Sequence, residues 1–391
     1  MSASHALVPA AAPAAPGGLP LRALGILPLL VAMPLLYWPK VIDGDTQPWL
    51  PLAAALAFVA YWPDRRTYRT GEGMLLLGLV LAAIAVFAWR GAEPAPLLRY
   101  GVILSAFTFL WFVGLRDQGE HIPRAVRWTI VIWFVIGFYQ VIAIRVGLPV
   151  EFVGRYIVGR SGVPSLTAEP SFYGSLSVLQ IMYLLTQRTS RNFPYIAMAA
   201  LSVLFSGSAL ALLMLAFPLA RLPTKLKIVG GMSLLLILML GYDLSRTGFF
   251  QRLQAFDLET AGTLLVLQDA STNLRAGHVV FTLWDNLWRE LTFQNGVAFQ
   301  SEYLDFAVRS GIFIPTGSDF ILPSAGELLF RSGAVGLFVL AALLRHAWFT
   351  AERRYDRLEK MAFIMVCLVS PITLINPFFV FYVQKRYADD R

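Results

Sequence analysis

One stretch decides the organisation of this chain: Gly159-Arg160-Ser161-Gly162-Val163-Pro164-Ser165-Leu166-Thr167-Ala168-Glu169-Pro170-Ser171-Phe172-Tyr173-Gly174. It is rich in turn residues and leads into an apolar run. Proline suits the first position of a helix because its missing N–H would have no partner there, and it biases the preceding residue towards an extended backbone. The stretch therefore predicts that Pro170 opens a helix and that the carboxylate of Glu169 is fixed at the helix entrance.

The composition around this stretch is that of a membrane protein. Hydrophobic residues make up 57% and charged residues 14% of 391, and the mean hydropathy is +0.63, whereas soluble domains average about 25% charged residues. The formal charge of +8 does not indicate nucleic acid, because the basic residues are scattered between apolar runs, where they set topology. The single cysteine, Cys367, lies in an apolar run and offers neither a disulfide nor a soft-metal site.

The apolar runs predict an all-α polytopic membrane protein with about eleven transmembrane helices. Residues 1–20 are rich in Ala and Pro and are expected to form a disordered tail. We assign 21–242 to helices one to nine, 243–324 to a large outer loop, and 325–391 to the last two helices and a tail. The runs lie near 21–38, 48–62, 73–89, 97–115, 126–146, 171–187, 193–206, 207–220, 227–242, 325–345 and 361–383.

Charge decides whether 193–220 is one helix or a hairpin broken at Ser206-Gly207-Ser208. With the hairpin, the basic clusters fall on one side, which is cytoplasmic by the positive-inside rule. They are Arg65, Arg66 and Arg69; Arg116, Arg124 and Arg127; Arg188 and Arg191; Arg221, Lys225 and Lys227; and Arg345, Arg353, Arg354, Arg357 and Lys360. A continuous eleventh span then places the C-terminus outside, although Asn376-Pro377 leaves a re-entrant break open.

Two connectors longer than turns face outwards in this topology, at about 147–170 and about 243–324. In the larger one, apolar residues repeat at helical spacing after Ser271-Thr272, which predicts an amphipathic helix. A second short helix is expected over 301–309. The repeating residues are Val279, Val280, Leu283, Trp284, Leu287, Trp288 and Leu291.

Arginine supplies the basic residues of both outer connectors, namely Arg155, Arg160, Arg246, Arg252, Arg275, Arg289 and Arg309. A guanidinium binds phosphate or pyrophosphate through two parallel hydrogen bonds. The chain has few lysines, however, so arginine is also its habitual cation. Arg275 and His278, spaced i,i+3, are expected to point the same way off the amphipathic helix, where a histidine facing lipid headgroups is the plainer alternative.

Glu169 has three open roles: a general base, an acceptor that orients a sugar hydroxyl, or the salt-bridge partner of Arg155 or Arg160. Asp319 and Glu327, which flank the entry to the tenth span, carry the same ambiguity. The sequence has no Walker loop, no HExxH and no paired-cysteine metal motif. It therefore does not indicate an ATP-driven pump or a zinc protease.

These motifs together resemble the outer-loop motifs of bacterial O-antigen polymerases (Wzy-type) and exopolysaccharide polymerases. The similar segments are Arg160-x-Gly162 with Thr167 to Gly174, the break Phe205 to Leu210, Ser271-x-x-x-Arg275 with Trp284 and Leu291-x-x-x-Asn295-Gly296, and Gly326 to Leu337. The related O-antigen ligases usually carry a histidine before the last glycine pair, where this sequence has Ile321-Leu322-Pro323-Ser324.

The resemblance implies glycan transfer at the periplasmic face of the bacterial inner membrane, without cofactor or metal. The donor would be an undecaprenyl-pyrophosphate-linked oligosaccharide and the acceptor a hydroxyl of a lipid-linked repeat unit. Arg160 and Arg275 would hold the pyrophosphate charge and Glu169 would act on the acceptor hydroxyl. Arg155, His278, Arg289 and Asp319 would bind substrate, and a chain-length regulator and a flippase of the same pathway are candidate partners.

Three other functions stay open at this point. A ligase would pass finished glycan to a different acceptor, a transporter or flippase would move lipid-linked solutes without chemistry, and an assembly subunit would tolerate alanine at Arg160 and Arg275.

Overall fold

The computed structural model describes residues 49–61, 70–116, 121–148, 162–167, 169–187, 189–221, 224, 227, 270–294, 298–315, 321–370, 374 and 376–387, and their regular elements are all helical. Three described helical stretches are long and apolar enough to cross a membrane: Pro94–Leu115, His121–Ile144 and Ser324–Thr350. The expected helical membrane protein is confirmed to this extent. The count of eleven spans stays a prediction. The run 21–38 lies outside the described residues, as does the run 227–242 apart from Lys227.

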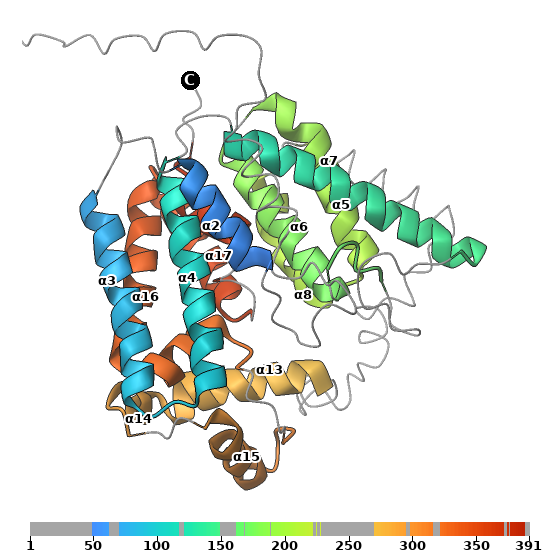
Figure 1. The fold of residues 1–391 in the computed structure, drawn as a ribbon. Helices are drawn as coiled ribbons and strands as arrows, with labels where there is room; N and C mark the ends of the chain where they lie inside the picture. The colour runs from blue at the N-terminus through green and yellow to red at the C-terminus, as the bar shows by residue number, and fades with distance from the viewer. Residues whose placement is uncertain are drawn as a thin grey trace, which may run out of the picture.

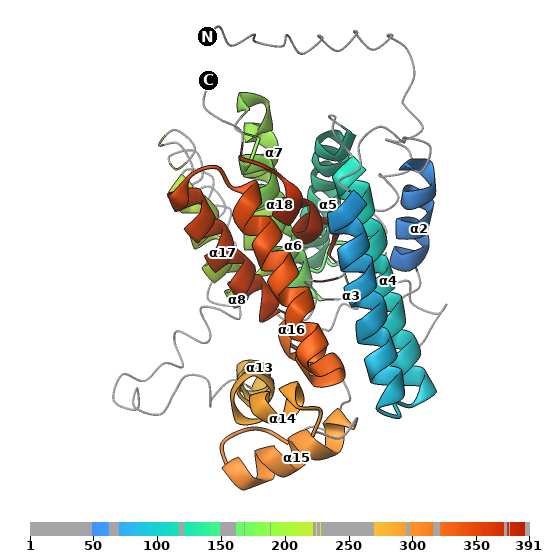
Figure 2. The same cartoon turned by 90° about the vertical axis from the view of Figure 1, so that its left-hand side faces the viewer.

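The apolar helices form a bundle whose one end is covered by a layer of three further helices (Figures 1 and 2). We call this the α13 end, and the opposite one, where α17 begins, the α17 end. The layer consists of α13 (Ala270–Val280), α14 (Leu287–Leu291) and α15 (Phe299–Ser310). The bundle contains α2 (Trp49–Tyr61), α3 (Thr70–Trp89), α4 (Pro94–Arg116), α5 (His121–Val146), α6 (Pro170–Leu185), α7 (Phe193–Ser206), α8 (Ala209–Met214), α9 (Ala216–Arg221), α16 (Ser324–Thr350), α17 (Arg354–Leu368) and α18 (Pro377–Gln384).

The segment 193–221 turns back at the expected break. Gly207 ends α7 with φ of 59°, a left-handed conformation that glycine adopts without strain. The Ser208 hydroxyl then accepts from the amide of Ala211 and begins α8. At the far end of α9, Arg221 forms ion pairs with Asp356 and Glu359 in the first turns of α17. This is the hairpin that the charge pattern favoured.

The continuous eleventh span expected over 361–383 is wrong. Helix α17 ends at Leu368, and α18 begins at Pro377 with the Asn376 side chain accepting from the amide of Phe378 at 3.0 Å. The chain then returns to the α17 end, where Lys360 Nζ donates to the carbonyl of Lys385 at 2.8 Å. The described C-terminal residues therefore lie on the side predicted to be cytoplasmic, not outside.

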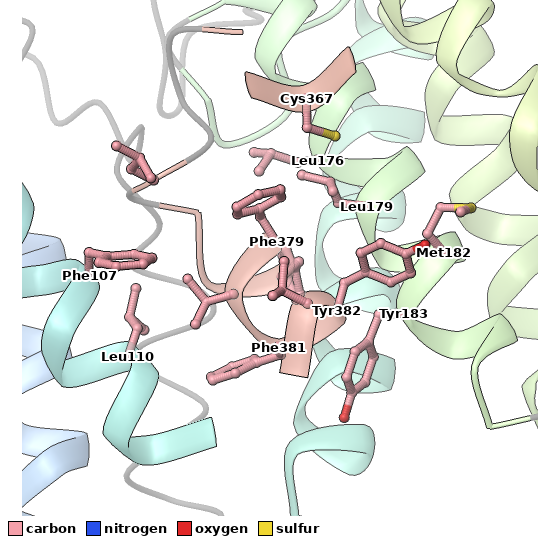
Figure 3. Packing of buried hydrophobic residues seen from close by; sticks show 14 of the residues in the cluster. Phe107, Leu110, Leu176, Leu179, Met182, Tyr183, Cys367, Phe379, Phe381 and Tyr382 are labelled. Carbon is pink, nitrogen blue, oxygen red and sulfur yellow. The ribbon is translucent and has the colours of Figure 1, made fainter. Parts of the chain in front are cut away.

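Helix α18 is short but lies at the centre of the bundle. Residues 377–383 are all buried, and Figure 3 shows Phe379 and Phe381 among Leu176 and Leu179 of α6 and Phe107 of α4. A helix that is apolar all round is stable only where protein or lipid surrounds it. This packing stabilises a helix of only eight residues inside the bundle.

The expected tenth span is present as α16, but this helix has a break within it. Gly333 in α16 has φ of 54° and ψ of −132°, so the helix consists of a short part, 324–332, and a long part, 334–350. A Cβ at Gly333 would lie 2.6 Å from the carbonyl oxygen of Glu290, so α14 packs directly on the break. The guanidinium of Arg90, just after α3, donates to the carbonyl of Phe330 at 2.6 Å and thereby satisfies a backbone group near the break.

We predict that Arg221→Ala destabilises the α17 end, because it leaves Asp356 and Glu359 without their cation while Asp356 is buried. Removing one partner of a buried ion pair costs about 3 kcal/mol. The thermal midpoint of the purified protein in detergent should fall clearly. Arg354→Ala, which alters an exposed arginine at the start of α17, is the control and should leave the midpoint unchanged; equal midpoints for both variants would contradict the prediction.

Candidate functional site

The segment before α6 is buried in the bundle at the break between α7 and α8. The amide of Val163 donates to the carbonyl of Phe205 at 2.9 Å. Gly162 has φ of 102°, and a Cβ there would lie 2.0 Å from the carbonyl oxygen of Ser206. Two of the motifs singled out in the sequence, one before α6 and one between α7 and α8, therefore lie against each other.

Helix α5 fixes the middle of this segment. The Gln140 side chain bonds both backbone groups of Ser165, accepting from its amide at 2.7 Å and donating to its carbonyl at 3.0 Å. The Ser165 hydroxyl donates to the carbonyl of Trp133 at 2.8 Å. Ser165 has φ of 52°, which costs a non-glycine residue about 1 kcal/mol or more. These hydrogen bonds hold Ser165 in that conformation.

Glu169 takes the predicted place at the start of α6. Its backbone is extended, with φ of −142° and ψ of 146°, and Pro170 is the first residue of the helix. The Thr167 hydroxyl donates to the carbonyl of Glu169 at 2.6 Å, and the Ser171 hydroxyl donates to its carboxylate at 3.3 Å. The side chain is half-buried, so it is oriented by its neighbours and still reachable from outside.

Helix α6 starts at the α13 end of the bundle. Its last turn lies at the other end, because Asn192 donates to the carbonyl of Leu184 at 3.1 Å and accepts from Arg127 at the start of α5. Helix α13, which carries Arg275, lies across the end of the bundle where α6 starts (Figure 1). Arg275 is half-buried and Arg289, on α14, is exposed. The structure thus brings the helix with Arg275 to the same end of the bundle as Glu169.

His278 is not on the surface. It therefore does not point off the helix together with Arg275, as the i,i+3 spacing had led us to expect. It is 1% exposed, and its ring lies edge-on to Tyr303 and Phe299, at 4.4 and 4.9 Å between ring centroids. Its Nδ1 accepts from the amide of Leu322 at 3.2 Å, and burial lowers its pKa to about 4. His278 is therefore a neutral ring beside a cluster of aromatic side chains that joins α13 to α15. We call it the aromatic cluster, and it contains Phe281, Phe299, Tyr303, Phe306 and Phe330.

Three of the candidate residues, Arg155, Arg160 and Asp319, lie outside the described residues. Helix α13 begins at Ala270, so Ser271 and Thr272 belong to its first turn and do not precede it. The short helix expected over 301–309 is present as α15. Within the described part of the chain, no three His, Cys, Asp or Glu side chains gather as a metal ion would need.

A second group of charges surrounds the break in α16. Arg331 pairs with Glu327 at 3.1 Å and lies over the ring of Phe87 at 5.0 Å. Glu290 of α14 is 0% exposed, and neither of its carboxyl oxygens has a hydrogen-bond partner among the described residues. Sequence reasoning assigned no role to Arg331 or Glu290. The i,i+4 spacing of Glu327 and Arg331 inside an apolar run was the one signal for this pair.

We predict that Gly162→Ala displaces the buried segment, since the new Cβ would meet the carbonyl of Ser206 in a left-handed backbone conformation. The cost is about 2 kcal/mol or more. Because Glu169 is oriented by this segment, any activity that depends on Glu169 should fall too. Gly78→Ala is the matched control, as a Cβ there has nothing within 4 Å. Equal thermal midpoints and activities for the two variants would contradict the prediction.

We predict that Glu290→Gln stabilises the protein. Burial, followed by the nearby charge of Glu302, raises the pKa of Glu290 from 4.5 to about 9. The folded state therefore binds a proton that the unfolded state releases above pH 4.5, and stability is lost as the pH rises towards 9. Glutamine does not titrate, so at pH 7 the variant should gain about 2 to 3 kcal/mol.

The measurement is the thermal midpoint of both proteins from pH 5 to 9 (about one pH unit per step). The gap between them should widen with rising pH. A gap that stays constant, or a destabilised glutamine variant, would show that Glu290 is ionised in the folded protein.

No family model, curated protein or solved structure matches this chain.

Proposed function

We propose that this protein is a polysaccharide polymerase of the inner membrane, acting at the periplasmic face. It would transfer a glycan from undecaprenyl pyrophosphate to a hydroxyl of a lipid-linked repeat unit. The observation that carries the proposal is the orientation of Glu169. A buried segment, held by α5 and by the break between α7 and α8, presents this carboxylate half-exposed at the mouth of a membrane helix.

A carboxylate placed in this way can accept the proton of a sugar hydroxyl. In the proposed step, the hydroxyl oxygen of the acceptor forms a bond to the anomeric carbon of the donor, while the bond from that carbon to the pyrophosphate oxygen breaks. The hydroxyl proton passes to Glu169 and the electron pair leaves with the pyrophosphate. General-base assistance of this kind contributes about 10²- to 10⁴-fold to a rate.

The leaving pyrophosphate is a stable anion and needs cations more than it needs a proton. Arg275, on the helix that crosses the same end of the bundle, and Arg160, which precedes α6 in the sequence, are the proposed cations, and Arg155 is proposed to support them. A guanidinium stays charged at any relevant pH and matches phosphate oxygens in pairs. Arg289 is exposed on α14 and so accessible to a phosphate group, whereas the burial of His278 leaves it a supporting role in packing.

A transporter is the second candidate, because helix α16 is discontinuous. Its break at Gly333 resembles the interrupted helices whose ends bind substrates in secondary transporters. The ligase alternative has no described feature in its favour, since the sequence lacks the expected histidine before Ser324.

The test is the length distribution of lipid-linked glycan in cells that lack this protein and are re-supplied with variants at matched membrane levels. Glu169→Gln keeps the size of the side chain but removes the base, and Arg275→Ala removes a cation. Both should leave single repeat units outside the membrane, with polymer reduced about 10²-fold or more. Arg309→Ala alters an exposed arginine of α15 and should leave long chains intact.

Three outcomes would replace the proposal. Long chains that form but stay on the lipid carrier would indicate a ligase. Repeat units trapped at the cytoplasmic face would indicate a transporter. Normal polymer with both variants would show that Glu169 and Arg275 are not part of the site.

A further inference from the structure

The apolar stripe of residues 279–291 divides into two parts in the structure. Leu283, Leu287 and Leu291 are partly buried and pack against the apolar interior of the bundle. Trp284 and Trp288 are 84% and 73% exposed. The sequence places all five on one broad helical stripe, but only the leucine part has a protein partner among the described residues.

Local backbone geometry explains the division. Residues 281–285 form a π-helical turn, and Asn286 leaves the helical conformation before α14 begins. The turn buries Phe281, which belongs to the aromatic cluster, and Thr282. Trp284 and Trp288 then follow one another at i,i+4 spacing on the side away from the bundle. Two adjacent large aromatic side chains left exposed are typical of an interaction surface.

This tryptophan pair lies beside the end of an exposed apolar helix face. Along α3, exposed apolar residues recur at helical spacing from Met74 through Leu81 to Trp89, which is 77% exposed. The Trp89 ring then contacts Phe293, just after α14, edge-on with 6.5 Å between ring centroids. The outward face of α3 therefore continues into the segment that carries Trp288.

From this continuity we propose that Trp89, Trp284 and Trp288 form a docking surface for the headgroup layer of the lipid bilayer. A tryptophan suits this layer because its ring is apolar and its indole N–H bonds to polar groups. Arg289 follows Trp288 and is exposed, and its side chain donates a 3.4 Å hydrogen bond to Asn286. Its guanidinium can bind the phosphate of an anionic lipid. The proposal goes beyond the proposed function, since it requires no glycan chemistry.

Lipid fits this surface better than a protein partner does. The exposed residues of α3 face outwards from a helix whose run Gly73–Trp89 is apolar, so lipid is the expected neighbour along its length. A protein bound at Trp284 and Trp288 would have to end where the lipid begins, at Trp89. A headgroup layer covers all three side chains without such a boundary.

The test uses single cysteines, which this chain makes simple because Cys367 is its only cysteine and is buried. In a Cys367→Ala background, cysteine replaces Trp284, Trp288, Leu81 or Gln300, one at a time, and carries a nitroxide label. The labelled full chain is reconstituted into vesicles of phosphatidylethanolamine and phosphatidylglycerol. Power saturation then compares collisions with oxygen, which concentrates in lipid, and with a water-soluble nickel chelate.

Labels at 284 and 288 should collide more with oxygen and less with the nickel chelate than the label at 300, which lies on α15 and is exposed to water. The label at 81 should lie deeper and shows that the bundle is folded. Removing phosphatidylglycerol should shift the label at 288 towards water. Arg289→Ala should abolish that shift, whereas Arg309→Ala, the matched exposed arginine, should preserve it.

Labels at 284 and 288 that behave like the label at 300 would overturn the proposal. Protection from both reagents would do so too, since it would mean that a second copy of the chain covers the surface. These vesicles contain no lipid-linked glycan, so the result is independent of whether the polymerase proposal holds.

Discussion

Backbone groups released at a helix break must find hydrogen-bond partners inside an apolar bundle, and this requirement shapes the structure. Water cannot supply the partners there, and each unsatisfied group costs several kcal/mol, of order 2 to 7. At the break after α7, the amide of Val163 bonds to the carbonyl of Phe205. At the break in α16, the guanidinium of Arg90 bonds to the carbonyl of Phe330. Each break is tied to a segment distant in the sequence.

Both breaks lie at the α13 end of the bundle, and they determine what can be built there. At the first break, the free backbone carbonyl bonds to the segment that leads to Glu169. The direction of that carboxylate therefore depends on the hairpin of α7 and α8. The second one places Gly333 against the carbonyl of Glu290, so no side chain fits between α14 and α16. The layer of α13 to α15 is thereby joined to the bundle by close backbone contact as well as by its aromatic cluster.

The sequence predicted those features that depend on local chemistry. Pro170 and Glu169 at the start of α6, the glycine break before Ala209 and the helix over 301–309 all follow from rules that act within a few residues. The break at Gly333 and the burial of His278 do not, and for the return of α18 the local signal, Asn376-Pro377, gave only an open alternative. Each depends on a distant contact, such as that of Arg90 with Phe330 or of Tyr303 with His278, which residue spacing does not reveal. Helical periodicity also grouped Trp284 with Leu283, because it measures which side chains are apolar and not which of them have a partner.

Charge balance around the break in α16 explains how five ionisable groups can gather there, of which Glu290 and Arg331 are buried. Arg90 and Arg331 carry two positive charges, and Glu290, Glu302 and Glu327 could carry three negative ones. Burial raises the pKa of Glu290 to about 9, so at neutral pH this carboxyl holds a proton and the remaining charges are equal in number. Burying Glu290 as an ionised carboxylate would cost more free energy than keeping a proton on it. The protein therefore keeps the acid in its neutral form, and the close packing of α14 on Gly333 becomes compatible with a glutamate at that position.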